Sequence, residues 1–171
     1  ILNRDYAMLN ADTATVQAPF QSLRSKVDVR FVLATKAPNG ACFEGITRTV
    51  SSQTNSSNGQ AQVNAVISGN NVYQGIWPHN KYLNIYVCTG LGGAAGYTFA
   101  PNNEGYGAPG ATISATNMYY NGVFILHDYT GSIGTSNVTT SRALTHEVGH
   151  WLNLEHTWGS TNNPGVACGN D

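Results

Sequence analysis

The sequence has few charged residues and no long apolar run. Only 10% of its 171 residues are charged, and eight basic against nine acidic side chains give a formal net charge of -1. No Lys/Arg cluster provides the positive surface that nucleic acids bind, so DNA and RNA are excluded as partners. No apolar segment approaches the roughly 20 residues of a membrane-spanning helix, so no membrane span is predicted. This length is typical of one domain with its own core.

Cysteine is also scarce, with three residues at Cys42, Cys88 and Cys168. In an oxidising compartment, an odd number predicts one internal bridge and one thiol with a partner elsewhere, and Cys42 with Cys88 is a reasonable pair. The alternative is three reduced thiols, with Cys42 and Cys88 buried at strand ends. The sequence does not separate these two possibilities.

The polar residues are mostly neutral, because Asn, Ser, Thr and Gly take the place of charged side chains. Such a surface is common in exported proteins. The chain opens at Ile1 without a start methionine or an apolar leader, so we expect a processed or trimmed product. These observations predict a secreted, extracellular protein.

The apolar patterns predict a mixture of helices and strands. Leu2, Tyr6 and Leu9 share a helical face, which predicts a helix over about the first fifteen residues, and Pro19 opens a short turn through Leu23. A polar loop at 51–62 leads into a short helix at 63–67, and a longer helix, capped by Thr139 or Thr140, covers 141–152. The connection at 121–138 is expected to be irregular. Five strands are predicted, at 27–33, 45–50, 82–88, 96–100 and 111–120.

Three of the five histidines fall within the segment HEVGHWLNLEH, from His146 to His156. Residues four apart on a helix lie on one face, about 6 Å apart along the axis, so His146 and His150 can bind one ion. Zinc binds imidazole nitrogen, and a catalytic zinc keeps one position open for water. Glu147 follows the first ligand, and its carboxylate can reach water in that position. This is the H-E-x-x-H pattern.

His156 is the expected third ligand, but a continuous helix would carry it about 9 Å beyond His150 and onto another face. We therefore expect the helix to break between them. Asn153 is the natural position for the break, because after glycine asparagine most readily adopts the left-handed conformation that ends a helix. Gly149 costs about 1 kcal/mol relative to alanine inside a helix, so we expect another segment to approach it closely.

These residues resemble the metzincin zinc peptidase signature, H-E-x-x-H-x-x-G-x-x-H followed by a methionine turn. His146, Glu147, His150 and His156 match it, whereas Asn153 takes the place of the glycine. Within the metzincins, the segments LTHEVGHWLNLEHTWG, NKYLNIYVC, GYTFAP and APNGACFEGITRT are similar to the pappalysin family, including its secreted bacterial and fungal members.

The resemblance implies an α+β fold with a metzincin-like N-terminal subdomain. A twisted five-stranded mixed sheet with helices would lie above a cleft, and the active-site helix would form the cleft floor. The edge strand, from Gly96 to Pro101, would pair with an extended peptide substrate by β-addition, through Gly96, Tyr97, Thr98 and Phe99. A structural calcium ion is also implied near the segment after the third histidine, with Asp171 as a candidate ligand.

The implied function is that of a zinc-dependent endopeptidase acting on extracellular proteins. One catalytic zinc ion, held by His146, His150 and His156, would polarise the scissile carbonyl and acidify its water. Glu147 would take the proton from that water and pass it to the leaving amine.

No methionine follows the histidines, since Met8 and Met118 both precede them. We therefore expect 1–171 to be a single catalytic domain in which 1–153 form the N-terminal subdomain. Residues 154–171 would begin a C-terminal subdomain that is truncated or cleaved. A second fragment of the same precursor would then carry the methionine turn and a partner for Cys168.

The alternative function is a secreted binding module with a purely structural zinc site. Structural zinc sites are usually closed by four protein ligands, and Cys168 and Asp171 are the candidates for a fourth. The number of protein ligands therefore separates the two hypotheses.

Overall fold

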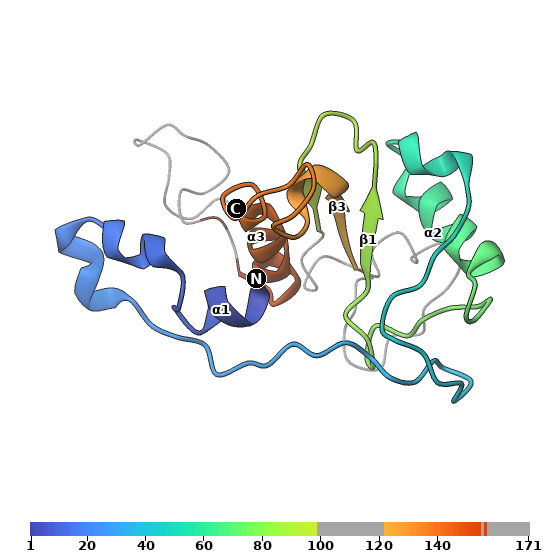
Figure 1. Ribbon diagram of the computed structural model, residues 1–171, viewed down its shortest axis with the longest axis horizontal. Helices are drawn as coiled ribbons and strands as arrows, with labels where there is room; N and C mark the ends of the chain where they lie inside the picture. The colour runs from blue at the N-terminus through green and yellow to red at the C-terminus, as the bar shows by residue number, and fades with distance from the viewer. Residues whose placement is uncertain (99–121, 155, 157–171) are drawn as a thin grey trace.

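The computed structural model describes residues 1–98, 122–154 and 156, and it has the α+β composition that the sequence predicts. None of the helices within these ranges is long and apolar enough to cross a membrane. The elements in chain order (Figure 1) are α1 Leu2–Tyr6, η1 Ala11–Thr15, η2 Ala18–Leu23, η3 Ser52–Asn55, α2 Gly59–Gly69, β1 Ile85–Cys88, β2 Gly96–Tyr97, β3 Val123–Leu126, η5 His127–Tyr129 and α3 Arg142–Trp151.

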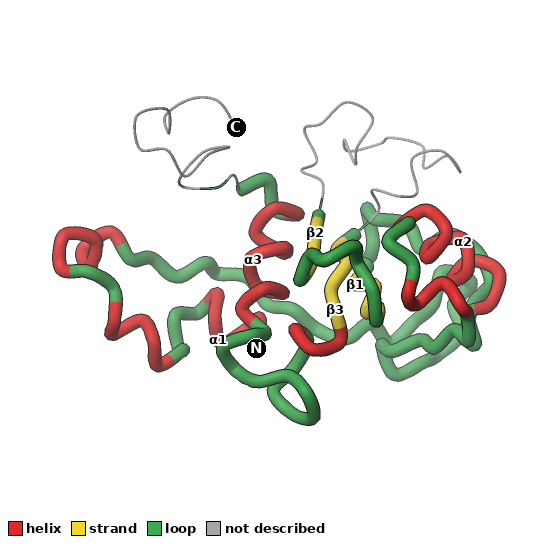
Figure 2. The backbone as a smooth tube through the Cα atoms, turned by 90° about the horizontal axis from the view of Figure 1, so that it is seen from above, coloured by secondary structure: helices red, strands yellow, loops and turns green. Residues whose placement is uncertain are grey.

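A mixed sheet with the strand order β1-β3-β2 lies at the centre of the described residues. β1 runs parallel to β3, with Ile85 opposite Val123, whereas β2 runs antiparallel to β3, with Tyr97 opposite Phe124. The side chains of Val123, Phe124 and Ile125 are 0% exposed, as expected for a strand that is covered on both faces. Figures 1 and 2 show α3 on one side of the sheet and α2 on the other.

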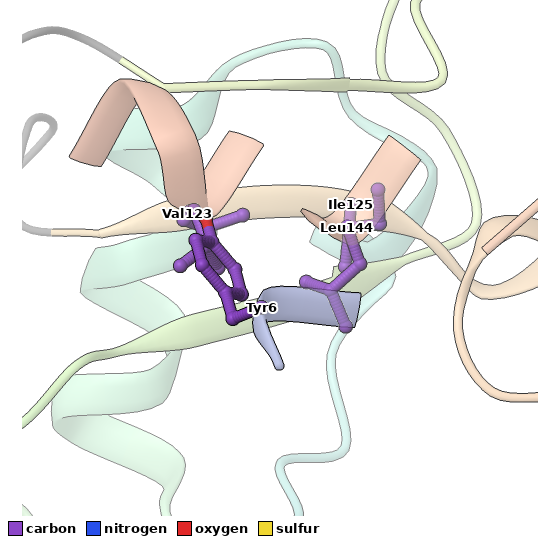
Figure 3. Packing of buried hydrophobic residues seen from close by; sticks show 5 residues of the cluster. Tyr6, Val123, Ile125 and Leu144 are labelled. Atoms are coloured by element: carbon purple, nitrogen blue, oxygen red, sulfur yellow. The ribbon is translucent and has the colours of Figure 1, made fainter. Parts of the chain in front are cut away.

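Successive side chains of β3 point to opposite faces of the sheet, so the strand contributes to two cores. On one face lies a cluster that joins β3 to α3 and α1 (Figure 3), formed by Tyr6, Val123, Ile125, Leu144 and Val148. On the other face lies the cluster beside α2, formed by Val63, Cys88, Leu91 and Phe124. The position of α3 is therefore fixed by the sheet and by the start of the chain together.

The N-terminal segment is attached to α3 by polar contacts as well. The hydroxyl of Thr145 donates to Asp5 over 2.7 Å, and the Arg142 guanidinium pairs with Asp5 and, over 2.7 Å, with Asp12. The Tyr6 hydroxyl donates to the carbonyl of Thr145 over 3.1 Å. These contacts link residues separated by well over 100 positions in the sequence.

The predicted N-terminal helix is shorter in the structure. α1 ends at Tyr6, and Met8 has a left-handed conformation with φ of 58°. That conformation cannot continue a helix, so the chain resumes as the separate helix η1, and Leu9 is left 73% exposed. The turn that was predicted from Pro19 to Leu23 is confirmed as η2.

Two of the five predicted strands are wrong, because residues 27–33 and 45–50 have no ladder partner. The backbone of Phe31 instead bonds to the Asn3 side chain, whose Nδ2 donates to the carbonyl over 2.8 Å and whose Oδ1 accepts from the amide over 2.7 Å. Among the described residues the sheet therefore has three strands rather than five. The strand predicted at 111–120 lies outside the described residues.

The structure also corrects the boundaries of two other elements. α2 begins at Gly59, before the predicted start at Val63, because the Asn58 side chain caps it by accepting from the Ala61 amide over 3.1 Å. β3 falls inside 121–138, where an irregular connection was predicted. The four apolar residues of β3 form too short a run to predict a strand from the sequence.

The disulfide predicted between Cys42 and Cys88 is absent, since both are free thiols. Cys88 is buried at the end of β1, as the reduced alternative expects, but Cys42 is exposed rather than buried. Cys168 lies outside the described residues.

Candidate metal centre

α3 is held in place by its apolar side and by the turn that precedes it. Leu144 and Val148 are buried against the sheet. The predicted caps are wrong, because Ser141 is the N-cap and its hydroxyl donates back to the carbonyl of Asn137 over 2.6 Å. The Asn137 side chain accepts from the amides of the two threonines at 139 and 140, over 2.9 and 3.0 Å. The threonines therefore belong to a turn stabilised by Asn137.

The helix ends as predicted, with Asn153 in the left-handed conformation at φ of 66°. The Asn153 amide donates to the carbonyl of His150 over 2.8 Å, and the Leu154 amide donates to that of Gly149 over 3.0 Å. This pair of bonds is the Schellman motif, which satisfies carbonyls at a helix end. The turn brings His156 back beside the helix.

The three predicted ligands converge. The Nε2 atom of His150 lies 3.0 Å from those of His146 and His156, which are 3.2 Å from each other. Three imidazole nitrogens at these distances can all lie about 2.0–2.1 Å from a single cation, the usual distance in zinc sites. The described residues offer no fourth His, Cys, Asp or Glu to this group.

The protonation of the histidines also suits a metal. Nδ1 of His150 lies 2.7 Å from the carbonyl oxygen of Leu154, which can only accept, so Nδ1 carries the proton and Nε2 presents a lone pair to the other rings. Burial, followed by the neighbouring charges of His150 and His156, lowers the pKa of His146 and favours its neutral form. The Leu154 contact was not predictable from the sequence, because any residue supplies a backbone carbonyl.

Glu147 is enclosed between α3 and β2. Its side chain is only 7% exposed, and Oε2 is buried without a hydrogen-bond partner among the described residues. Burial raises the pKa of Glu147 to about 7, and the nearby Thr98 hydroxyl opposes this shift. Buried carboxylates normally have partners, so an unpaired one beside three converging imidazoles fits a site that receives a metal and its water.

The predicted edge strand lies against Glu147, since a Cβ atom added at Gly96 would be 2.9 Å from Cγ of Glu147. Gly96 and Tyr97 form β2, which pairs only with β3 among the described strands, and Thr98 follows it. Phe99 and Asp171 lie outside the described residues. On the other side of α3, a cleft of about 450 Å³ runs from the histidines to the N-terminal segment, where Asp5 and Tyr6 line it. The resemblance implies a cleft along α3, but the sequence alone does not show that the start of the chain forms one of its walls.

The comparison with known families agrees with this geometry. The family described as pregnancy-associated plasma protein-A, Peptidase_M43, matches residues 66–171, more than half of the chain. The chain belongs to this pappalysin family. The resemblance predicted from the histidine segment is therefore confirmed, and the pappalysin family implies a zinc cofactor.

Fungal relatives of this pappalysin are named extracellular metalloproteases. One from Neurospora crassa is 35% identical over 78 residues, covering 46% of this chain and 25% of that protein. Extracellular metalloprotease 1 of Coccidioides posadasii is 36% identical over 76 residues, covering 44% and 25%. The chain thus spans about a quarter of the length of these relatives.

Solved pappalysin structures share the fold. Mature mirolysin of Tannerella forsythia, in complex with a cleaved peptide, is 32% identical with a TM-score of 0.76, and the match covers 99% of this chain and 58% of that one. Mirolysin in complex with a compound numbered 9 is 34% identical with a TM-score of 0.72, and the match covers 93% of this chain and 55% of that one. The chain therefore corresponds to somewhat more than half of these mirolysin chains.

Proposed function

We propose that this chain is the catalytic part of a secreted, zinc-dependent endopeptidase in which Glu147 transfers the proton during peptide-bond hydrolysis. The observation that carries the proposal is the convergence of three imidazole Nε2 atoms, 3.0 to 3.2 Å apart, next to a buried carboxylate. Membership of a metallopeptidase family supports it.

His146, His150 and His156 are the residues that would hold zinc. When bound, zinc acts as a Lewis acid that polarises a carbonyl and lowers the pKa of a coordinated water to about 7. The described residues offer three ligands, whereas the candidates for a fourth, Cys168 and Asp171, lie outside them. Membership of a peptidase family therefore favours an enzyme over the alternative of a binding module with a closed, structural zinc site.

Glu147 is suited to move the proton. Its raised pKa, about 7, lets the carboxylate accept a proton near neutral pH and release it again. We infer that Glu147 takes the proton of the attacking water and delivers it to the nitrogen of the leaving amine. The backbone around it is rigid, because α3 packs on the sheet through Val148, which is 0% exposed.

The substrate would be an extended peptide, consistent with the cleaved peptide in the mirolysin complex. Among the described strands β2 pairs with β3, through Gly96 and Tyr97, and the substrate would add to this sheet as a further extended strand along Gly96, Tyr97, Thr98 and Phe99. Such pairing would hold the scissile bond beside Glu147. Extracellular proteins are the proposed substrates, since the fungal relatives are named extracellular.

The decisive experiment is Glu147→Ala in the full-length protein. We expect the variant to retain one zinc per chain, because the three histidines are unchanged, and to lose at least about 100-fold in kcat, the smallest usual contribution of acid–base catalysis. Zinc content by mass spectrometry and cleavage of a denatured protein substrate are the two measurements. Cleavage at the wild-type rate would refute the role of Glu147, and a fourth protein ligand seen by X-ray absorption would favour the binding module.

A further inference from the structure

β2 presents alternate residues to opposite faces of the sheet. Tyr97 stacks on Phe124 with ring centroids 4.8 Å apart and an interplanar angle of 14°, on the face of α2. Gly96 lies opposite Ile125, whose side chain belongs to the core beneath α3. Because side chains alternate along an extended chain, Gly96 and Thr98 both face α3.

Gly96 lies in contact with Glu147 itself. A Cβ atom added at Gly96 would be 2.9 Å from Cγ of Glu147, 2.8 Å from Cδ1 of Ile125 and 2.9 Å from the carbonyl oxygen of Phe124. All three distances are shorter than real Cβ contacts allow. Because glycine has no side chain, the space beside position 96 is left for the methylene groups of Glu147.

Thr98 lies two residues after Gly96, on the same face of the extended chain, and Gly96 is the residue in contact with Cγ of Glu147. Oγ1 of Thr98 and Oε2 of Glu147 are both buried, and neither completes a hydrogen bond of normal geometry within the described part of the chain. The Thr98 hydroxyl can donate and the carboxylate oxygen can accept, so the two buried groups are complementary.

We propose that β2 holds Glu147 in its reactive orientation, with Gly96 leaving room for the methylene groups and the Thr98 hydroxyl donating to the carboxylate. The inference rests on the proposed function. It makes Gly96 and Thr98 positioning residues, distinct from the backbone groups of β2 that would pair with a peptide. Both act through Glu147.

Thr98→Val in the full-length protein removes the hydroxyl and keeps the shape. We expect kcat to fall about 10-fold, in the range usual for residues that orient a reactive group. KM and zinc content should stay unchanged, because neither substrate pairing nor the histidines are altered. Thr98→Ser should restore most of kcat, and Thr135→Val, at an exposed threonine, is the matched control.

Three results would overturn this role. They are a wild-type kcat for Thr98→Val, equal loss in Thr98→Val and Thr98→Ser, or a raised KM with kcat unchanged. The last result would mean that Thr98 contacts the substrate instead.

The role of Gly96 is tested without activity, by a double-mutant cycle in thermal unfolding. Gly96→Ala should lower the Tm of the wild-type protein because the new methyl group meets Glu147, Ile125 and Phe124. In the Glu147→Ala background one of these clashes is gone, so the drop should be smaller by about 2 °C or more, as expected for contacting residues.

An equal drop in both backgrounds would contradict the contact. The cycle also separates two kinds of failure. A wild-type protein that binds zinc but cleaves no peptide refutes the proposed function, and it leaves the cycle to decide whether Gly96 constrains Glu147.

Discussion

At the scale of single residues, the site depends on Asn153 as much as on the histidines. Its left-handed φ of 66° closes the turn that returns His156 to the helix, and the carbonyl of the next residue, Leu154, accepts a hydrogen bond from Nδ1 of His150. The convergence of the three histidines was predictable, because His146 and His150 share a helical face, and the break at Asn153 was predictable, because His156 cannot reach them on a continuous helix. The contact of His150 with the Leu154 carbonyl and the contact of Glu147 with Gly96 depend on where the backbone lies. The residue types in the sequence do not indicate either contact.

Asn153→Ala should weaken zinc binding, whereas Asn153→Gly should not. A left-handed alanine costs about 1–2 kcal/mol, and glycine adopts this conformation without that cost. If the strain is relieved by opening the turn, His156 leaves the site, so we expect the zinc dissociation constant of the alanine variant to rise about 10-fold. Competition with a zinc-binding dye measures it. Equal affinities for the two variants would show that the turn does not hold His156.

At the scale of elements, α3 was the best predicted part of the chain. Its apolar and polar sides follow the helical period over ten residues, and burial of Leu144 and Val148 agrees with it. The strands were predicted less well. The alternation at 27–33 predicts a half-buried strand, yet Leu33, on the side expected to be buried, is 64% exposed, because alternation shows a preference for extended structure and does not identify a neighbouring strand.

Gly149→Ala should stabilise α3. A close neighbour was expected at this glycine, but the nearest atom to an added Cβ is the hydroxyl oxygen of Tyr6 at 3.7 Å, which is ordinary contact. Alanine is favoured over glycine in a helix by about 1 kcal/mol, so we expect Tm to rise by about 2–4 °C with zinc content unchanged. Calorimetry of the two proteins checks this. A lower Tm would mean that Tyr6 lies closer than the structure shows.

At the scale of the whole molecule, the first residues of the chain fasten the helix that carries the site. Asp5 has a side chain that is only 4% exposed and pairs with Arg142 and Thr145. Burial alone would raise the pKa of Asp5, but the bonds from Arg142 and Thr145 and the charges of Arg142 and Arg4 outweigh it, so its pKa lies below the ordinary value. This long-range pair was not predictable, since one sequence does not show which distant charges meet.

The stability of the protein should therefore fall in acid, in part because of Asp5. A carboxyl group whose pKa is depressed in the folded state stabilises the protein above its unfolded pKa, about 3.9, and this contribution is lost as pH falls through the folded value. We expect Asp5→Asn to cost on the order of 2 kcal/mol at pH 7 and progressively less as pH falls toward 2 and Asp5 of the wild-type protein becomes protonated. Urea unfolding at several pH values measures the difference.

Asp28→Asn, at an exposed position, is the control and should show little cost at either pH. A cost for Asp5→Asn that is the same at pH 7 and pH 2 would contradict the role of the charge.

The bonds from Asp5 and Tyr6 to Thr145 also set an order of events during synthesis. They join positions 140 and 139 residues apart, so the first of each pair leaves the ribosome long before the second. Until Thr145 emerges, neither the helix nor its histidines have this support. The nascent chain therefore completes its cluster of three histidines only near the end of translation of this region, after the central strand is already available to receive the helix.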